Sequence, residues 1–181
     1  MASIKEIFSH AGQQALPSTV AEHELLAVEQ RIACKLPGTF REFYSMANAP
    51  RLLKQYSNSD WPLSVGELAK PMSRWRNYDP IDDKILPFMN ENQGVCVWGV
   101  RLDAGDDPPV VVEVDSGTPP RWQLCAQRFT NWLQFQVDHF RVFGSSWFVA
   151  QAPALTDNAR RLLSRHFEEG LQTHAWPGVT N

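Results

Sequence analysis

The chain has 181 residues, of which 43% are hydrophobic and 11% aromatic, so its composition fits one folded domain and excludes an intrinsically disordered protein. Its net charge of −3 argues against a nucleic-acid-binding protein, and no stretch reaches the ~18 apolar residues that a membrane-spanning helix needs. Three widely spaced cysteines, Cys34, Cys96 and Cys125, lie among apolar residues, which is typical of a reducing compartment. Because the N-terminus also lacks the pattern of a signal peptide, we expect a cytoplasmic protein.

Two helices are predicted at the start of the chain. Residues 3–14 place their apolar side chains on one helical face. Thr19 and Glu22 have the spacing of a capping box, in which the two side chains satisfy free amides at a helix start. The second helix is expected to end near Lys35, since Pro37 disfavours a helical conformation in the residue before it.

A short helix with an aromatic stripe at residues 40–44 is predicted next, and residues 48–50 should close it. Residues 51–62 are polar and predict an irregular loop. Ser64 and Glu67 repeat the capping-box spacing, which predicts a single helical turn.

Four β-strands are predicted in the middle of the chain. Residues 85–89 and 95–102 should form a hairpin whose polar turn ends on Gly94. The second strand of this hairpin is apolar at both alternating sets of positions, so both of its faces should be covered. Residues 110–114 and 122–125 predict the third and fourth strands.

The C-terminal part returns to a helical pattern. In residues 128–140 apolar side chains recur at helical spacing, with Gln136 as the one polar exception. A final helix is predicted from Thr156, and the residues after His174 should form a loose tail.

No catalytic or metal-binding motif is present in the sequence. The five histidines lack zinc-site spacing, no two cysteines are close in sequence, and there is no glycine-rich phosphate loop. Neighbouring carboxylates such as Asp82 and Asp83 do not bracket a substrate as paired catalytic acids must. We therefore expect no enzyme activity, no cofactor and no metal. The alternative is an active site assembled from residues distant in sequence.

The negative charge is concentrated in one segment. Residues 79–115 carry nine acidic and two basic side chains, whereas the segments before and after it are each net positive by two. Such a field would repel phosphate groups and attract a basic partner. The simpler alternative is a set of loop aspartates exposed to solvent. Residues 74–78 alternate basic and aromatic residues, which suits either a contact surface or an edge strand whose arginine stems cover the rings.

Several short motifs follow one another in a recognisable order. The first motif is Leu36-Pro37, which precedes an aromatic segment ending at Asn48. The second is Leu86-Pro-Phe, which leads through Gly94 into a strand. The third and fourth are Pro109-Val-Val-Val and Phe129-x-x-Trp-Leu133. Together they resemble the SUKH superfamily, which includes fungal regulators of glucan synthesis and many bacterial immunity proteins.

The resemblance implies a single SUKH-like α+β domain with a core at about residues 20–140. Residues 145–181, which the resemblance does not cover, are expected to form a C-terminal helical extension of this domain. It implies a central, mostly antiparallel or mixed β-sheet of at least four strands, with helices packed against it. It also implies a non-enzymatic protein-binding module with no cofactor.

By this resemblance, the chain is expected to be an immunity protein that binds and neutralises a cognate bacterial toxin such as a nuclease. The partner should be a protein with a basic surface, with no nucleic acid or membrane involved. The alternative is a regulatory or scaffolding protein of the same fold with an endogenous protein partner. The candidate partner-binding residues are an acidic rim and two aromatic anchors: Asp79, Asp82, Asp83, Asp103, Asp106, Asp107, Trp75 and Trp98. For Trp98, a place in the core is the competing interpretation.

Overall fold

A computed structural model describes residues 3–10, 12, 14, 16, 19–57, 59–75, 77–115, 117–143, 156–158 and 161. The helices of this part of the chain are α1 (Ile4–His10), α2 (Thr19–Ile32), α3 (Gly38–Tyr44), α4 (Ala49–Gln55), α5 (Val65–Leu68), the 3-10 helix η1 (Pro80–Asp83) and α6 (Phe129–Phe143). The strands are β1 (Trp61–Pro62), β2 (Ile85–Asn90), β3 (Val97–Arg101), β4 (Val110–Asp115) and β5 (Arg121–Ala126).

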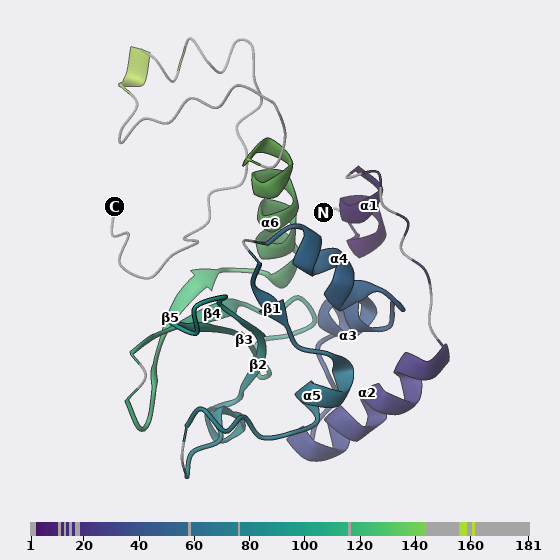
Figure 1. Ribbon diagram of the computed structural model, residues 1–181, viewed down its shortest axis with the longest axis vertical. Coiled ribbons are helices and arrows are strands. Elements are labelled where there is room, and N and C mark those ends of the chain that lie inside the picture. The colour runs from purple at the N-terminus through teal and green to yellow at the C-terminus, as the bar shows by residue number, and fades with distance from the viewer. Residues whose placement is uncertain are drawn as a thin grey trace.

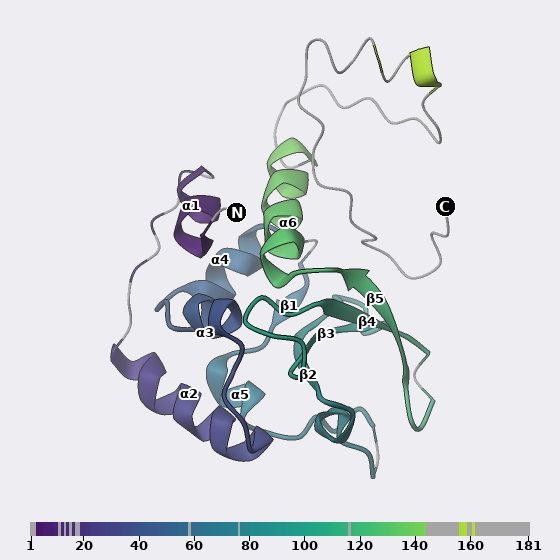
Figure 2. The same ribbon diagram turned by 180° about the vertical axis from the view of Figure 1, so that it is seen from behind.

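The five strands form one antiparallel sheet in the order β1-β2-β3-β4-β5, so each strand pairs with its neighbour in the chain. Figure 1 shows α1, α3, α4 and α6 grouped against one side of this sheet, with α2 and α5 alongside them. The reverse view in Figure 2 shows the loop between β3 and β4 lying beside α3. The predicted α+β architecture with at least four strands is therefore confirmed. None of the helices in the described ranges is both long and apolar enough to cross a membrane.

Aromatic side chains join the helices to the sheet. The ring of Phe88 on β2 lies 5.6 Å from Phe40 of α3 and 5.0 Å from Trp132 of α6, measured between centroids. Phe129, at the start of α6, lies 5.2 Å from Phe40. All four side chains are fully buried. Edge-on aromatic contacts at these distances add about 0.5–1.5 kcal/mol per pair beyond area burial, so this cluster holds α3, β2 and α6 together.

Most predicted elements are confirmed, with boundaries shifted by a few residues. The capping box of α5 is present, since the Ser64 hydroxyl accepts from the Glu67 N–H at 3.3 Å and the Glu67 carboxylate accepts from the Ser64 N–H at 2.7 Å. The second helix ends at Ile32, three residues before the predicted end, where Ala33 takes a left-handed conformation with φ 53°. The predicted final helix and tail lie outside the described residues, apart from 156–158 and 161.

The prediction of an irregular loop over residues 51–62 was wrong. Residues 49–55 form α4, and Trp61 and Pro62 form the edge strand β1. Pro50 was interpreted as closing the preceding helix, yet it lies in the first turn of α4, where its missing N–H leaves no intrahelical bond unmade. The side chains of Leu52 and Leu53 are buried and form the inner face of this helix.

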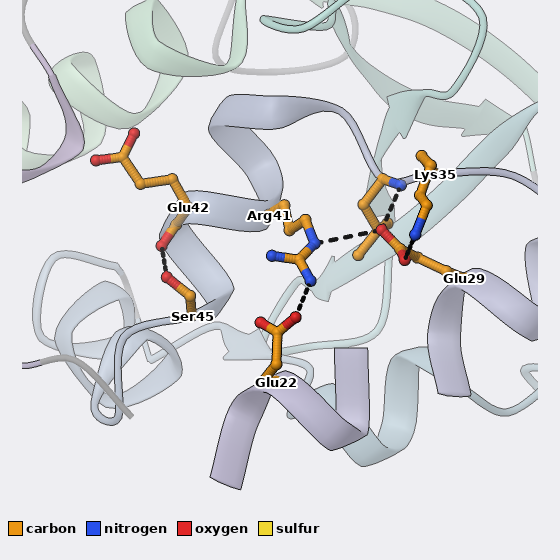
Figure 3. A network of polar contacts seen from close by, with 7 residues as sticks. Glu22, Glu29, Lys35, Arg41, Glu42 and Ser45 are labelled. Carbon is orange, nitrogen blue, oxygen red and sulfur yellow. Dashed lines mark hydrogen bonds and ion pairs between the residues drawn. The ribbon is translucent and has the colours of Figure 1, made fainter. Parts of the chain in front are cut away.

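A polar network fastens α2 to α3 (Figure 3). The buried carboxylate of Glu29 accepts from the Leu36 N–H at 3.1 Å, from Lys35 Nζ at 3.0 Å and from Arg41 Nε at 3.3 Å. Arg41 also pairs with Glu22 on the first turns of α2. The carboxylate of Glu29 therefore satisfies a free amide between the two helices while two cations balance its charge.

This network predicts a loss of stability in acid. Burial alone would raise the pKa of Glu29, but hydrogen bonds from Lys35 and the Leu36 N–H, with the charges of Lys35 and Arg41, lower it below 4.5. A carboxyl group whose pKa is lower in the folded state contributes its full stabilisation above its unfolded pKa and loses it as the pH falls through the folded pKa. We expect the free energy of unfolding in urea to fall from about pH 4.5 downward, and Glu29→Gln to reduce that fall. Glu24→Gln, on the exposed face of α2, is the control and should leave the acid dependence unchanged. An unaltered pH profile in Glu29→Gln would contradict the assignment.

Candidate protein-binding surface

Two acidic loops meet where β2 begins and β3 ends. The first loop contains η1, and the second connects β3 to β4. The Leu102 N–H donates to the carbonyl oxygen of Lys84 at 2.8 Å, so the two loops lie side by side. Asp82 and Asp83 of the first loop and Asp103 of the second are exposed. The fold thus brings together carboxylates that are about twenty positions apart in the sequence.

Asp79, one of the predicted rim residues, has a structural role. Its Oδ1 accepts from the Ile81 N–H at 3.2 Å and so caps η1. Its Oδ2 forms an ion pair with the guanidinium of Arg31 on α2, and Arg31 also donates to the Leu68 carbonyl oxygen at 3.2 Å. Asp79 therefore fixes the first acidic loop to α2 and α5, and its charge is already compensated.

Asp107 caps α6 from a distant loop. Its Oδ1 accepts from the Thr130 N–H at 3.0 Å and from the Thr39 hydroxyl at 3.2 Å, and its Oδ2 accepts from the Thr130 hydroxyl. The residue directly before α6 is Arg128, whose side chain is a donor and has no oxygen with which to cap the helix. The neighbouring Asp106 accepts from the Thr39 N–H at 2.8 Å through its main-chain oxygen and leaves its carboxylate exposed.

Asp103 and Asp83 each have one side-chain partner and remain at the surface. Asp103 receives two hydrogen bonds from Arg101, at 2.9 Å from Nε and 2.7 Å from the terminal nitrogen. These bonds lower the pKa of Asp103, so its carboxylate stays ionised. Asp83 accepts from the Tyr78 hydroxyl. Burial, with Asp83 as the next cause, raises the pKa of Tyr78, so this hydroxyl keeps the proton that it donates.

The two predicted aromatic anchors are buried. Trp98 is 2% exposed and belongs to the main core, as the competing interpretation had it. Trp75 is 3% exposed and donates through its indole N–H to Glu113 at 2.8 Å. The structure describes residues 74, 75, 77 and 78 of this segment, and none of these four belongs to a strand, so the edge strand considered for the segment is not found among them. Neither indole ring is available to a partner in this structure.

A buried ion pair holds the Trp75 segment to the sheet. The Arg74 Nε lies 2.9 Å from the Oε2 of Glu113, whose side chain is fully buried. The same guanidinium donates to the carbonyl oxygens of Gly94 at 2.6 Å and Val95 at 3.1 Å. Arg74 therefore ties the segment before the first acidic loop to the β2–β3 turn and to β4.

An open pocket of about 510 Å³ lies beside the acidic loops. Its sheet residues include Ile85 and Val111, neither of which belongs to the main core cluster, so the pocket opens on the face turned away from the helices. Its lining residues are Ile85, Arg101, Asp103, Ala104, Pro109, Val111, Trp122 and Leu124. Sequence reasoning missed this pocket. The available signal was the two-residue spacing of Trp122 and Leu124, which places both on one face of β5.

The surface combines exposed carboxylates with the apolar lining of the pocket. In the parts of the chain that the structure describes, no group of three or more His, Cys, Asp or Glu side chains is placed to hold a metal ion. Burial raises the pKa of the Cys125 and Cys96 thiols to about 12, so both stay protonated and neither serves as a thiolate nucleophile.

The model of the SMI1/KNR4 family (SUKH-1) matches residues 19–134, which run from α2 into α6. Comparison with curated proteins and with solved structures found no match. The matched range contains the whole sheet and both acidic loops.

Proposed function

Since the chain belongs to the SMI1/KNR4 family (SUKH-1), whose members are protein-interaction modules and generally non-catalytic, we propose that it is an immunity-type protein. In this proposal it acts in the cytoplasm, where it binds and neutralises a cognate bacterial toxin with a basic surface, such as a nuclease. No cofactor or metal takes part.

One observation carries the proposal. The hydrogen bond between Leu102 and Lys84 holds two loops together, and four exposed aspartates project from them. Of the six predicted rim residues, Asp82, Asp83, Asp103 and Asp106 have exposed side chains, whereas Asp79 and Asp107 serve the fold. We therefore narrow the proposed electrostatic rim to these four.

Complementary charge acts mainly on the rate of encounter. An acidic rim raises the local concentration of a basic partner and disfavours acidic competitors. It would also keep nucleic acid away from the interface, since a phosphate backbone and the rim repel each other. An inhibitor of a nuclease needs this discrimination, because the nuclease surface is built to attract phosphate.

The test is a binding measurement with the protein encoded beside this chain. Neutralising three rim residues in Asp82→Asn/Asp83→Asn/Asp103→Asn should lower the association rate at low salt by about tenfold or more. At an ionic strength of about 1 M, where the screening length falls to ~3 Å, the difference from the wild type should nearly vanish.

The matched control removes three exposed carboxylates from elsewhere on the surface, in Glu24→Gln/Asp115→Asn/Asp138→Asn. Its change in net charge is the same, so any larger effect of the rim variant reports on position. Equal association rates for the two variants would show that the rim lies outside the interface.

A neighbouring gene product that does not bind the wild type would overturn the immunity role. A gene surrounded by housekeeping genes would favour the alternative, a regulatory or scaffolding protein with an endogenous partner.

A further inference from the structure

The pocket beside the acidic loops is bordered by a strand with a free side. β5 pairs with β4 through Val111↔Leu124, Val112↔Gln123 and Glu113↔Trp122. No described strand pairs with β5 on its other side. Natural edge strands are usually protected by lysine, proline or a covering segment. The residues of β5 after Arg121 are Trp, Gln, Leu, Cys and Ala, which include none of the protecting residue types.

The pocket has an apolar floor and an acidic mouth. Val111 and Ile85 form buried parts of the floor, and Leu124 is 41% exposed at the border with β5. At the mouth, the guanidinium of Arg101 is bound to Asp103 and also lies within electrostatic range of Asp83. Lys84 in turn lies within electrostatic range of Asp103. The two acidic loops that border the mouth carry the exposed carboxylates of Asp82, Asp83, Asp103 and Asp106 against the two cations Lys84 and Arg101, so the loops as a whole have a net negative charge.

We propose, building on the protein-binding function above, that β5 and this pocket receive an extended basic segment of the partner protein. The segment adds a sixth strand to the free side of β5, and its main chain supplies hydrogen bonds that do not depend on sequence. Side chains of a strand alternate between two faces. An aliphatic side chain of the added strand therefore packs against Leu124 at the border of the pocket, and a lysine or arginine on the same face extends across the pocket toward the acidic mouth.

Charge argues against two other occupants. A second copy of this chain would bring another acidic mouth to the same edge, and like charges placed opposite each other are unfavourable. Residues 144–181 of the chain itself carry three arginines against three carboxylates, which gives the segment no net charge to attract it to the mouth. A basic segment from outside satisfies both the apolar floor and the acidic mouth.

The experiment uses the full chain as bait for a random library of nine-residue peptides displayed on yeast, which samples extended segments of every charge. We expect wild-type protein to enrich peptides that carry lysine or arginine two residues from a Val, Ile or Leu. Leu124→Lys removes apolar surface and adds a positive charge, so its enrichment of these peptides should be lower than that of the wild type by about tenfold or more.

Gln123→Lys is the matched control. It makes the same change of charge one residue away on the same exposed strand, but its side chain points to the other face of the sheet. The enrichment should survive in this variant, and circular dichroism of both variants checks that each is folded. Asp103→Asn should reduce the basic preference and retain the aliphatic one.

Three results would overturn the proposal. The first is that the wild-type protein enriches no peptides, and the second is that Leu124→Lys enriches the same peptides as the wild type. The third is a wild-type dimer that dissociates in Leu124→Lys, because this would show that the edge of β5 binds a second copy of the chain. These outcomes are separate from failure of the proposed function. If the neighbouring product binds and the rim variant weakens it while Leu124→Lys does not, the immunity role stands and only the strand addition fails.

Discussion

Glu113→Ala is expected to lower the free energy of unfolding by about 3–5 kcal/mol, the usual cost of removing one partner from a buried ion pair. The Glu113 side chain is fully buried, and the variant leaves the Arg74 guanidinium, on a side chain that is 25% exposed, without its counter-charge. It also leaves the buried indole N–H of Trp75 without its acceptor. Urea denaturation gives the value directly, and the melting temperature should fall by about 10 °C.

Two companion variants separate charge from packing. Glu113→Gln keeps a carbonyl oxygen for the Trp75 indole, so it should lose less stability than Glu113→Ala. The double variant Arg74→Met/Glu113→Leu replaces both charges by apolar groups, and such replacements are often neutral. It should therefore be more stable than Glu113→Ala alone. A loss below about 1 kcal/mol in Glu113→Ala would show that the pair contributes no more than an exposed one.

Asp107→Ala is expected to cost about 2–3 kcal/mol, since it removes the cap of α6 and two further hydrogen bonds to threonine hydroxyls. The Thr130 N–H lies at a helix N-terminus and would lose its acceptor. Because α6 contributes Phe129 and Trp132 to the aromatic cluster, fraying of its first turn would reach the core. Thermal unfolding followed by circular dichroism measures the loss.

Asp106→Asn is the matched control for this prediction. The two aspartates are adjacent, but Asp106 contributes only its main-chain oxygen to Thr39 and its carboxylate is exposed. Its substitution should change stability by no more than about 0.5 kcal/mol. If both variants lose the same amount, the effect belongs to the charge of the loop and the capping role of Asp107 is wrong.

Local signals were sufficient for most of the fold. The capping spacing of Ser64 and Glu67 predicted α5, and the helical recurrence from Phe129 to Val137 predicted α6 with its buried face. Both signals come from residues within one or two helical turns of each other, so the residues that interact are also close together in the sequence. α4 was missed because the proline of its first turn is equally compatible with the end of the preceding helix.

The candidate site was less predictable because its residues act over long separations. In the sequence, Asp79 and Asp107 look the same as Asp82 and Asp106, because all four are aspartates in predicted loops. What distinguishes them is a partner 48 residues away in one case and 23 in the other. Glu113 is a charged residue in an apolar strand, and nothing nearby in the sequence indicates that it would form a buried ion pair with Arg74.

The order of strands in the sheet has a consequence for how the chain tolerates insertions. Every strand pairs with its neighbour in sequence, and from β2 to β5 no helix intervenes, so each of these three connections only has to close a hairpin. Doubling the length of such a flexible loop costs only about 0.6 kcal/mol of closure entropy. In the β3–β4 connection, hydrogen bonds anchor Leu102 at one end and the Asp106-Asp107 pair at the other. Extra residues inserted between these two anchors would lengthen the acidic loop outward while leaving the sheet register and the start of α6 in place.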